Sequence, residues 1–162
     1  MAKKQSAGTP ATSVLEKAGV AWTAHPYDHD PRAVSYGLEA AEALGVPAAQ
    51  VFKTLLADCD GTLVVGVIPV DAQLDLKALA KAVGAKKASM ADPALAERVT
   101  GYVVGGIAPL GQKRALRTVV DASAEEWDLV YVSGGRRGYD IGLAPADLVA
   151  LTRATLAPVA RR

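Results

Sequence analysis

Cysteine is nearly absent from this sequence. Cys59 is the only one in 162 residues, so no disulfide can form within the chain. A chain without disulfides suits the reducing cytosol, and we therefore expect a cytoplasmic protein. Long apolar runs are missing too, because the longest, at 63–70, is interrupted by Gly66 and Pro69 and is far too short to span a bilayer. The polar start at 1–8 is followed by no apolar stretch, so we expect neither a secretory signal nor a membrane partner.

Aromatic residues and net charge are also scarce. Aromatics make up 5% of the chain, so we expect a core of small aliphatic side chains. The net charge is +1, whereas a protein whose whole surface gripped nucleic acid would be more basic. Basic residues do cluster at 86–87, 113–117, 136–137 and 161–162. Such clusters are typical of solvated loop ends, and local tRNA contact stays open.

Metal-binding and cofactor motifs are missing as well. The two histidines, His25 and His29, would lie roughly 13 Å apart on an extended chain at ~3.3 Å per residue, too far to share one ion. The chain has no CxxC, HExxH or G-x-S-x-G motif, and we expect no metal and no cofactor. Cys59 has no activating partner nearby in sequence, and we interpret it as a small, partly packed residue.

The length and the 51% share of hydrophobic residues are those of one folded domain. No repeat or linker divides the chain. We expect residues 9–162 to form a single domain and residues 1–8 to be a flexible N-terminal extension.

Helix starts are marked by capping residues, often followed by proline, and glycines mark several helix ends. Ser123, with Glu126 three residues later, predicts a capping box for a single helical turn. Longer helices are expected from Thr9 to Gly19, Ser35 to Gly45, Asp75 to Gly84, Asp92 through Val99, and Pro145 through Leu151.

Short apolar segments between these helices predict strands, and Asp60-Gly61 is a strong hairpin signal. The expected strands lie at 21–27, 51–58, 62–70, 102–107, 118–121, 129–133 and 139–143. Because hairpins and single crossovers mix irregularly, the pattern favours an α+β fold with a mixed sheet over a doubly wound parallel one.

Lys53 interrupts one of these apolar strands. Period-two alternation places it on the same face as Val51, Leu55 and Ala57. A buried lysine is rare unless it is paired, so Lys53 either lies in a pocket or protects an edge strand against aggregation.

Two glycine-rich segments also stand out. At 100–111, glycines interrupt a β-rich stretch, which indicates either a β-bulge or a place where a ligand approaches the backbone closely. Exposed backbone N–H groups at such a place can hold an oxyanion. At 133–140, the segment lacks the ending and spacing of a phosphate-binding loop, and a hairpin turn carrying basic residues explains it equally well.

These segments occur in an order and spacing that resemble the YbaK-type aminoacyl-tRNA deacylases, from about Val14 to the C-terminus. The resemblance is densest in VFKTLL at 51–56, QLDLK at 73–77, GAKK at 84–87, MADP at 90–93, TGY at 100–102, GGIAPLGQ at 105–112 and YVSGG at 131–135.

The resemblance implies a fold similar to the editing domain of bacterial prolyl-tRNA synthetases, a mixed β-barrel-like sheet flanked by helices. The family's lysine falls on Lys53, its G-x-x-x-P loop on Gly105 to Pro109, its tyrosine on Tyr27 and its aspartate on Asp140. These four positions are the expected catalytic residues, with Gly105 representing the loop. Gly106, Pro109, Ser133 and Gly134 are the expected substrate-binding residues.

The function implied is trans-editing, the removal of cysteine wrongly attached to proline tRNA. In YbaK-like enzymes the substrate's own thiol is thought to attack its ester, which would account for the missing protein nucleophile. Two alternatives stay open: a deacylase for alanyl or seryl tRNA that uses water, and a non-catalytic module that binds tRNA or a synthetase. The expected partners are the acceptor end of the aminoacyl-tRNA and, further, prolyl-tRNA synthetase.

Overall fold

The structure is a computed structural model that describes residues 8–162. The predicted N-terminal extension therefore lies outside the described residues, except for Gly8. The helices are α1 (Pro10–Ala18), α2 (Tyr36–Leu44), α3 (Leu76–Val83), α4 (Pro93–Thr100) and α5 (Pro145–Thr152), with short 3-10 turns η2 (Ala48–Gln50) and η3 (Ala122–Glu126). The strands are β1 (Trp22–Pro26), β2 (Phe52–Cys59), β3 (Thr62–Pro69), β4 (Gln73–Leu74), β5 (Ala88–Met90), β6 (Arg117–Asp121), β7 (Val130–Arg136), β8 (Tyr139–Leu143), β9 (Thr155–Ala157) and β10 (Ala160–Arg161).

Capping residues begin the helices where the sequence predicts. The side chains of Thr9, Ser35, Asp75 and Asp92 each accept a hydrogen bond from a backbone N–H of the first helical turn. Glycines in the left-handed region end these four helices. One predicted cap is wrong: Asp121, not Ser123, caps the turn η3 and accepts from the Ser123 N–H at 3.2 Å. An aspartate two residues upstream displaced the weaker hydroxyl cap.

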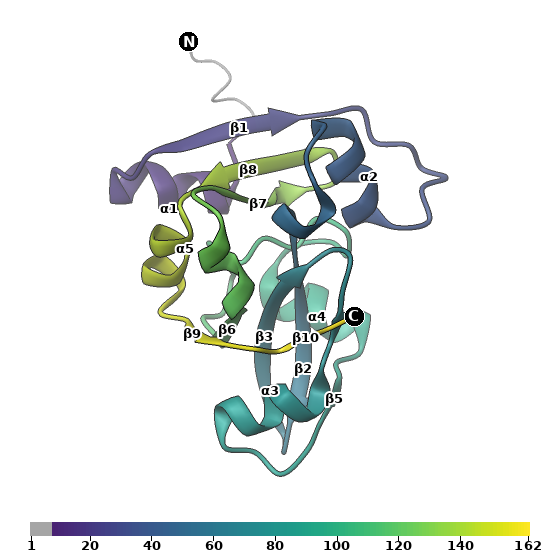
Figure 1. Ribbon diagram of the computed structural model, residues 1–162, viewed down its shortest axis with the longest axis vertical. Helices are drawn as coiled ribbons and strands as arrows, with labels where there is room; N and C mark the ends of the chain where they lie inside the picture. The colour runs from purple at the N-terminus through teal and green to yellow at the C-terminus, as the bar shows by residue number, and fades with distance from the viewer. Residues whose placement is uncertain (1–7) are drawn as a thin grey trace.

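The strands form three sheets, as Figure 1 shows for the two larger ones. The larger of them, in the order β5-β2-β3-β6-β9, is mixed, since β3 pairs parallel with β6 and β6 with β9. A second sheet, β1-β8-β7, is antiparallel, and a two-stranded sheet joins β10 to β4. A single parallel bridge between Val51 and Tyr131 links the two larger sheets. The α+β class with a mixed sheet is confirmed, although the strands of the described residues do not close into a barrel.

The predicted strand at 102–107 is wrong, because these residues form a loop with a turn at 104–105. Gly105 has φ +89°, a conformation that a strand does not use. Side chains hold the loop in place of a strand ladder: the Tyr102 hydroxyl donates to the Leu110 carbonyl at 2.7 Å, and Gln112 Nε2 donates to the Ala108 carbonyl at 3.0 Å. The next strand, β6, begins only at Arg117.

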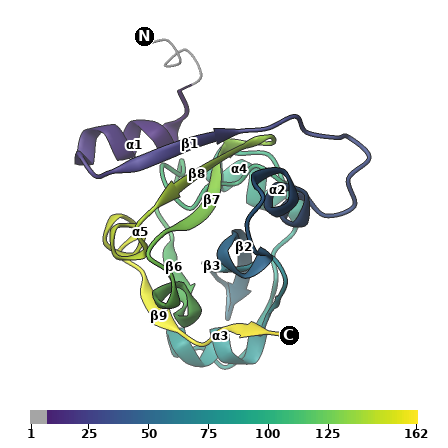
Figure 2. The ribbon, with the colours of Figure 1, turned by 45° about the horizontal axis from the view of Figure 1, so that its top comes forward.

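Apolar side chains pack on both faces of the β2–β3 hairpin. One cluster combines Phe52, Leu56 and Val67 with Ile141 and other residues of the antiparallel sheet, so it fills part of the space between the two larger sheets. Another packs the opposite face of the hairpin against α3, which lies beside it in Figure 1. A strand buried on both faces needs apolar residues at nearly every position, which explains the apolar run of β3. In Figure 2, α1 and α5 flank the sheets away from α2. Ala40 and Ala41 of α2 pack with Val51 and Val70, which lie just before β2 and just after β3.

Candidate active site

A cavity of about 370 Å³ lies between the two larger sheets, beneath α2 and α4. Two of its sides have different construction. The strand wall (residues 51–56) is mainly β2, and the loop wall (residues 104–107) belongs to the turn after α4. The ends of β7 and β8 complete the cavity. It is lined by Tyr27, Val34, Ser35, Tyr36, Gly37, Ala40, Val51, Phe52, Lys53, Thr54, Leu55, Leu56, Val70, Met90, Ala91, Pro93, Ala96, Val104, Gly105, Ile107, Ser133 and Asp140.

Lys53 lies in the strand wall, opposite Ile68 of β3, and is half-buried. Burial lowers the pKa of its ammonium group, while the nearby carboxylate of Asp71 acts in the opposite sense. Lys53 borders the cavity in a stretch of β2 that pairs with β3 alone, because β5 pairs only with residues 57–59, so its place agrees with both interpretations drawn from the sequence. It supplies a cationic donor at an otherwise apolar surface.

Asp140 and Tyr27 form the polar corner of the cavity. Asp140 lies in β8 and pairs with Ser133 of β7 and His25 of β1, and only 5% of its surface is exposed. Burial raises the pKa of its carboxyl to about 7. Burial, followed by the charges of Asp140 and Glu39, raises the pKa of Tyr27 to about 12. Tyr27 is therefore a phenol donor at neutral pH, and Asp140 can change protonation state there.

Gly105 occupies the third position of a β-turn. The Gly106 N–H donates to the Val103 carbonyl at 2.8 Å, and φ +89° at Gly105 is the value that a type II turn requires at that position. The Val104 N–H donates to Glu97 Oε2 at 2.8 Å. Within the described residues the Gly105 N–H has no hydrogen-bond partner, and Gly105 itself lines the cavity.

The remaining expected residues divide into two groups. Ser133 lines the cavity, and its Oγ accepts from the Gly135 N–H at 3.1 Å. Gly106, Pro109 and Gly134 lie outside the lining. A Cβ at Gly106 would come within 2.7 Å of the backbone of Arg136, and one at Gly134 would meet the ring of Tyr139 at 2.5 Å. The structure therefore places Gly106 at a close packing contact between the loop wall and the β7–β8 hairpin, and Gly134 at one between β7 and β8 within that hairpin.

Three site features went unnoticed in the sequence. The Thr54 hydroxyl is buried beside the cavity with no hydrogen-bond partner among the described residues. Tyr36 lies against Gly105, and Arg137 reaches the carbonyl of Val104. Only weak signals could have found them: a hydroxyl on an inward strand position, an aromatic residue directly after a helix cap, and a basic hairpin tip.

Metal-binding groups, membrane-spanning helices and the single cysteine can each be examined in residues 8–162. Across residues 8–162, no group of three or more His, Cys, Asp or Glu side chains could hold a metal ion. None of the helices in that range has the length and apolar character needed to cross a membrane. Cys59 is buried in the cluster under α3, outside the cavity lining, and burial raises the pKa of its thiol.

Comparison with known proteins assigns the family. The model of the aminoacyl-tRNA editing domain matches residues 31–151. A protein of Enterococcus faecalis, provisionally named the Cys-tRNA(Pro)/Cys-tRNA(Cys) deacylase EbsC, is 41% identical over 120 residues, which cover 74% of this chain and 73% of that protein. This chain belongs to the aminoacyl-tRNA editing domain family. It is an aminoacyl-tRNA deacylase, which confirms the enzyme class and the family predicted from the sequence.

Two further similarities bear on substrate and fold. The multifunctional Ser/Thr-tRNA deacylase ProXp-y of Escherichia coli K12 is 29% identical over 120 residues, covering 71% of this chain and 72% of that one. A crystal structure described as a candidate trans-editing enzyme for prolyl-tRNA synthetase has a TM-score of 0.83 at 24% identity, over 94% of this chain and 96% of that one. That likeness confirms the fold.

Proposed function

We propose that this protein is a trans-editing deacylase that removes cysteine from mischarged proline tRNA. The observation that carries the proposal is the meeting of Tyr27, Lys53, Gly105 and Asp140 around one cavity, although they come from four separate parts of the chain. An apolar pocket with a few convergent polar groups suits a small amino acid linked to a nucleoside. We also propose that residues 9–162 act as one domain.

Each of these residues has a task that its surroundings support. The free N–H of Gly105 would donate to the acyl carbonyl and stabilise the oxyanion that develops on it. Lys53 would donate to oxygens of the terminal adenosine or its phosphate. Tyr27 and Asp140 would orient the ribose and the amino group. The carboxylate form of Asp140 is the one that pairs with an ammonium group, and such a partner would lower its pKa again.

The described residues show no activated protein nucleophile in the cavity lining: Ser35 Oγ and Ser133 Oγ accept from backbone N–H groups, and the Thr54 hydroxyl has no hydrogen-bond partner. The lining has no cysteine or histidine, and Cys59 is buried elsewhere with its thiol protonated. In the proposed step, the substrate's sulfur attacks its own carbonyl carbon. A C–S bond forms, the C–O bond to the ribose breaks, and the thiol proton is transferred to the ribose oxygen. The products are a cyclic thioester and free tRNA. Holding two groups of one molecule in attack geometry can supply much of the required acceleration.

The hydroxyl of Thr54 supports a second candidate substrate. A buried hydroxyl without a partner costs free energy, and a substrate hydroxyl near it would supply one. The relation to a deacylase named for serine and threonine agrees with this alternative, in which water attacks the ester. Thr54→Val keeps the shape and removes the hydroxyl, so it should slow the removal of serine and leave that of cysteine within about twofold.

The cavity accounts for the amino acid but not for the tRNA. It has room for the aminoacyl end, which has the same terminal adenosine in every tRNA, so tRNA choice must come from another surface or another protein. We propose prolyl-tRNA synthetase as the partner that delivers proline tRNA, and the cytoplasm, where charged tRNA is used, as the site of action.

A deacylation assay tests the proposal. Proline tRNA charged separately with cysteine, alanine and serine is supplied at equal concentration, and the first product is identified. We expect fast loss of cysteine through a thiolactone and slow loss of the other two. A pocket rejects smaller side chains poorly, so discrimination against alanine must come from the thiol. Equal rates with free amino acid as the first product would overturn the thiol mechanism and favour activated water.

A further inference from the structure

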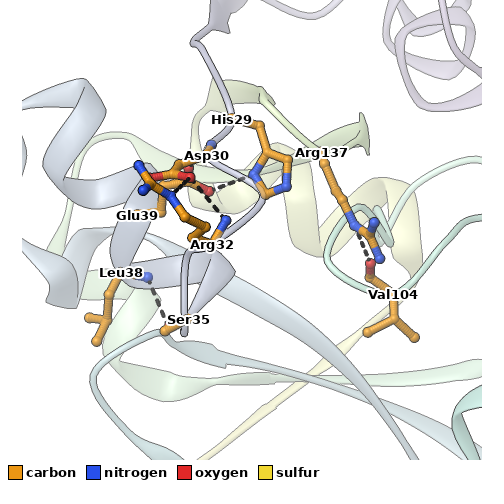
Figure 3. A network of polar contacts seen from close by, with 8 residues as sticks. All are labelled: His29, Asp30, Arg32, Ser35, Leu38, Glu39, Val104 and Arg137. Atoms are coloured by element: carbon orange, nitrogen blue, oxygen red, sulfur yellow. Dashed lines mark hydrogen bonds and ion pairs between the residues drawn. The ribbon is translucent and has the colours of Figure 1, made fainter.

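The Val104–Gly105 peptide is held from outside the cavity by Arg137. The Nε–H of Arg137 donates to the Val104 carbonyl at 2.9 Å, as Figure 3 shows. The two residues are 33 positions apart, and Arg137 comes from the tip of the β7–β8 hairpin. This contact joins the hairpin to the loop wall at the peptide that carries the free Gly105 N–H.

Tyr36 holds Arg137 in this position. The guanidinium carbon of Arg137 lies 4.9 Å from the centre of the Tyr36 ring, a cation–π distance. The same ring covers Gly105 so closely that a Cβ there would come within 2.8 Å of it. The Tyr36 ring also lies 5.7 Å from the ring of His29, whose Nδ1 bonds to Glu39 Oε1 at 2.8 Å. Arg137, Tyr36 and Gly105 thus form one stack, supported by His29 and Glu39.

The geometry of the peptide bond links the position of Arg137 to the direction of the Gly105 N–H. In a trans peptide, the C=O and the N–H point in opposite directions. Fixing the Val104 carbonyl toward Arg137 therefore fixes the Gly105 N–H on the opposite side. Type I and type II turns differ by a flip of this central peptide, and glycine tolerates the third position of both. The turn sequence alone leaves the direction of the N–H undecided.

We propose that Arg137, stacked on Tyr36, is a positioning residue that keeps the Gly105 N–H directed at the substrate carbonyl. This inference rests on the role proposed above for Gly105. Arg137 lies outside the cavity lining, and Tyr36, which is part of the lining, acts through the ring that it places over Gly105. They prevent the peptide flip that would turn a carbonyl oxygen, in place of a donor, toward the developing oxyanion.

The test measures kcat and KM separately for four variants. Arg137→Gln should lower kcat by about 10- to 100-fold, less than outright loss of an oxyanion donor, with KM within about twofold. Arg137→Lys should not rescue it, since lysine has no planar fork to stack on the ring. Tyr36→Leu should resemble Arg137→Gln, and Tyr36→Phe should restore most of the activity. The double variant Tyr36→Leu/Arg137→Gln should be no slower than Arg137→Gln alone.

Arg32→Gln is the matched control. Arg32 is an exposed arginine in the loop before α2, paired with Asp30 at 3.3 Å, and its loss should leave kcat unchanged. A direct readout is the Gly105 amide signal in NMR spectra of the 15N-labelled full chain. This signal should broaden or shift in Arg137→Gln and stay in place in Arg32→Gln.

Two results would overturn the inference. An unchanged kcat in folded Arg137→Gln would show that the turn keeps its own orientation. A raised KM with an unchanged kcat and a weaker dependence on salt would show that Arg137 binds a tRNA phosphate instead. Failure of the proposed function would look different, because the wild type itself would then leave cysteine attached to proline tRNA. Failure of the Gly105 role alone would leave folded Gly105→Ala active while the wild type still removes cysteine.

Discussion

The two walls of the cavity hold their functional groups in different ways. The strand wall is fixed by backbone hydrogen bonds, since all eight residues of β2 pair with β3. The loop wall depends on side chains: Glu97, Arg137 and Tyr102 bond its backbone or that of the adjoining loop. A ladder survives the loss of one side chain, whereas a loop held by a few side chains does not. A substitution in the strand wall should therefore change activity without changing the free energy of unfolding. A substitution in the loop wall should change both.

Lys53→Ala should give the largest loss of activity. We expect kcat/KM to fall about 100-fold or more, because charge-assisted hydrogen bonds are lost in an apolar pocket. The free energy of unfolding should change by less than ~1 kcal/mol, since the ladder stays intact. Deacylation rates and urea unfolding curves measure the two quantities. Near-normal activity would make Lys53 a structural residue, and a large loss of stability would break the contrast between the walls.

Gly105→Ala should lower both the activity and the free energy of unfolding. Alanine at φ +89° is strained, and its methyl group would press on the Tyr36 ring. Strain and overpacking together should lower the free energy of unfolding by about 2–4 kcal/mol, and deacylation should be nearly lost. Thermal unfolding and the rate at a temperature well below the midpoint separate the two effects. A stable, active variant would remove the loop wall from the mechanism.

Asp140→Asn tests the buried carboxyl through pH. Because the folded state raises this pKa from 3.8 to about 7, folding favours the protonated form. The folded state therefore holds an extra proton between these values, and wild-type stability should decrease as pH rises from about 4 to about 7, then level off. Asparagine removes this dependence. The free energy of unfolding of the variant, relative to that of wild type, should be about 2–4 kcal/mol higher at pH 8 than at pH 4. If the variant and wild type differed in free energy of unfolding by the same amount at pH 4 and pH 8, the raised pKa of Asp140 would be contradicted.

Tyr102→Phe probes the loop wall by a smaller change. It removes the hydroxyl that donates to the Leu110 carbonyl at 2.7 Å and keeps the buried ring. We expect a loss of about 1 kcal/mol in the free energy of unfolding. Activity should fall a few-fold as the loop loosens, which steady-state kinetics would detect. Loss of stability with wholly normal kinetics would show that this anchor does not act on the site.

Cys59→Ser should have the smallest effect on activity. The thiol is buried outside the cavity, in the cluster under α3, so the rate should stay within about twofold. A hydroxyl in that apolar cluster should cost about 1 kcal/mol of stability. Inactivation with an unchanged melting curve would identify Cys59 as the nucleophile.

Local signals in the sequence predicted most helices and strands. Contacts between residues far apart in the sequence decided the others. The helix caps and the Asp60-Gly61 hairpin depend on interactions between residues a few positions apart. Their structure can therefore be predicted from the sequence alone. The short strands β4, β5, β9 and β10 were not predicted, since two or three residues form a strand only where a partner is already in place. The segment at 102–107 has a strand-like composition, yet packing against Tyr36 and the hairpin made it a loop.

The sequence by itself determined the family, the α+β class and the strand face that Lys53 shares with Val51, Leu55 and Ala57, because alternation, caps and motif spacing are properties of the chain. Only the tertiary structure decided that Tyr27, Lys53, Gly105 and Asp140 share a cavity, and that Asp140 is buried deeply enough to raise its pKa to about 7. The direction of the Gly105 N–H also belongs to the tertiary structure. A glycine turn permits two orientations of its peptide, and a guanidinium 33 residues away selects one.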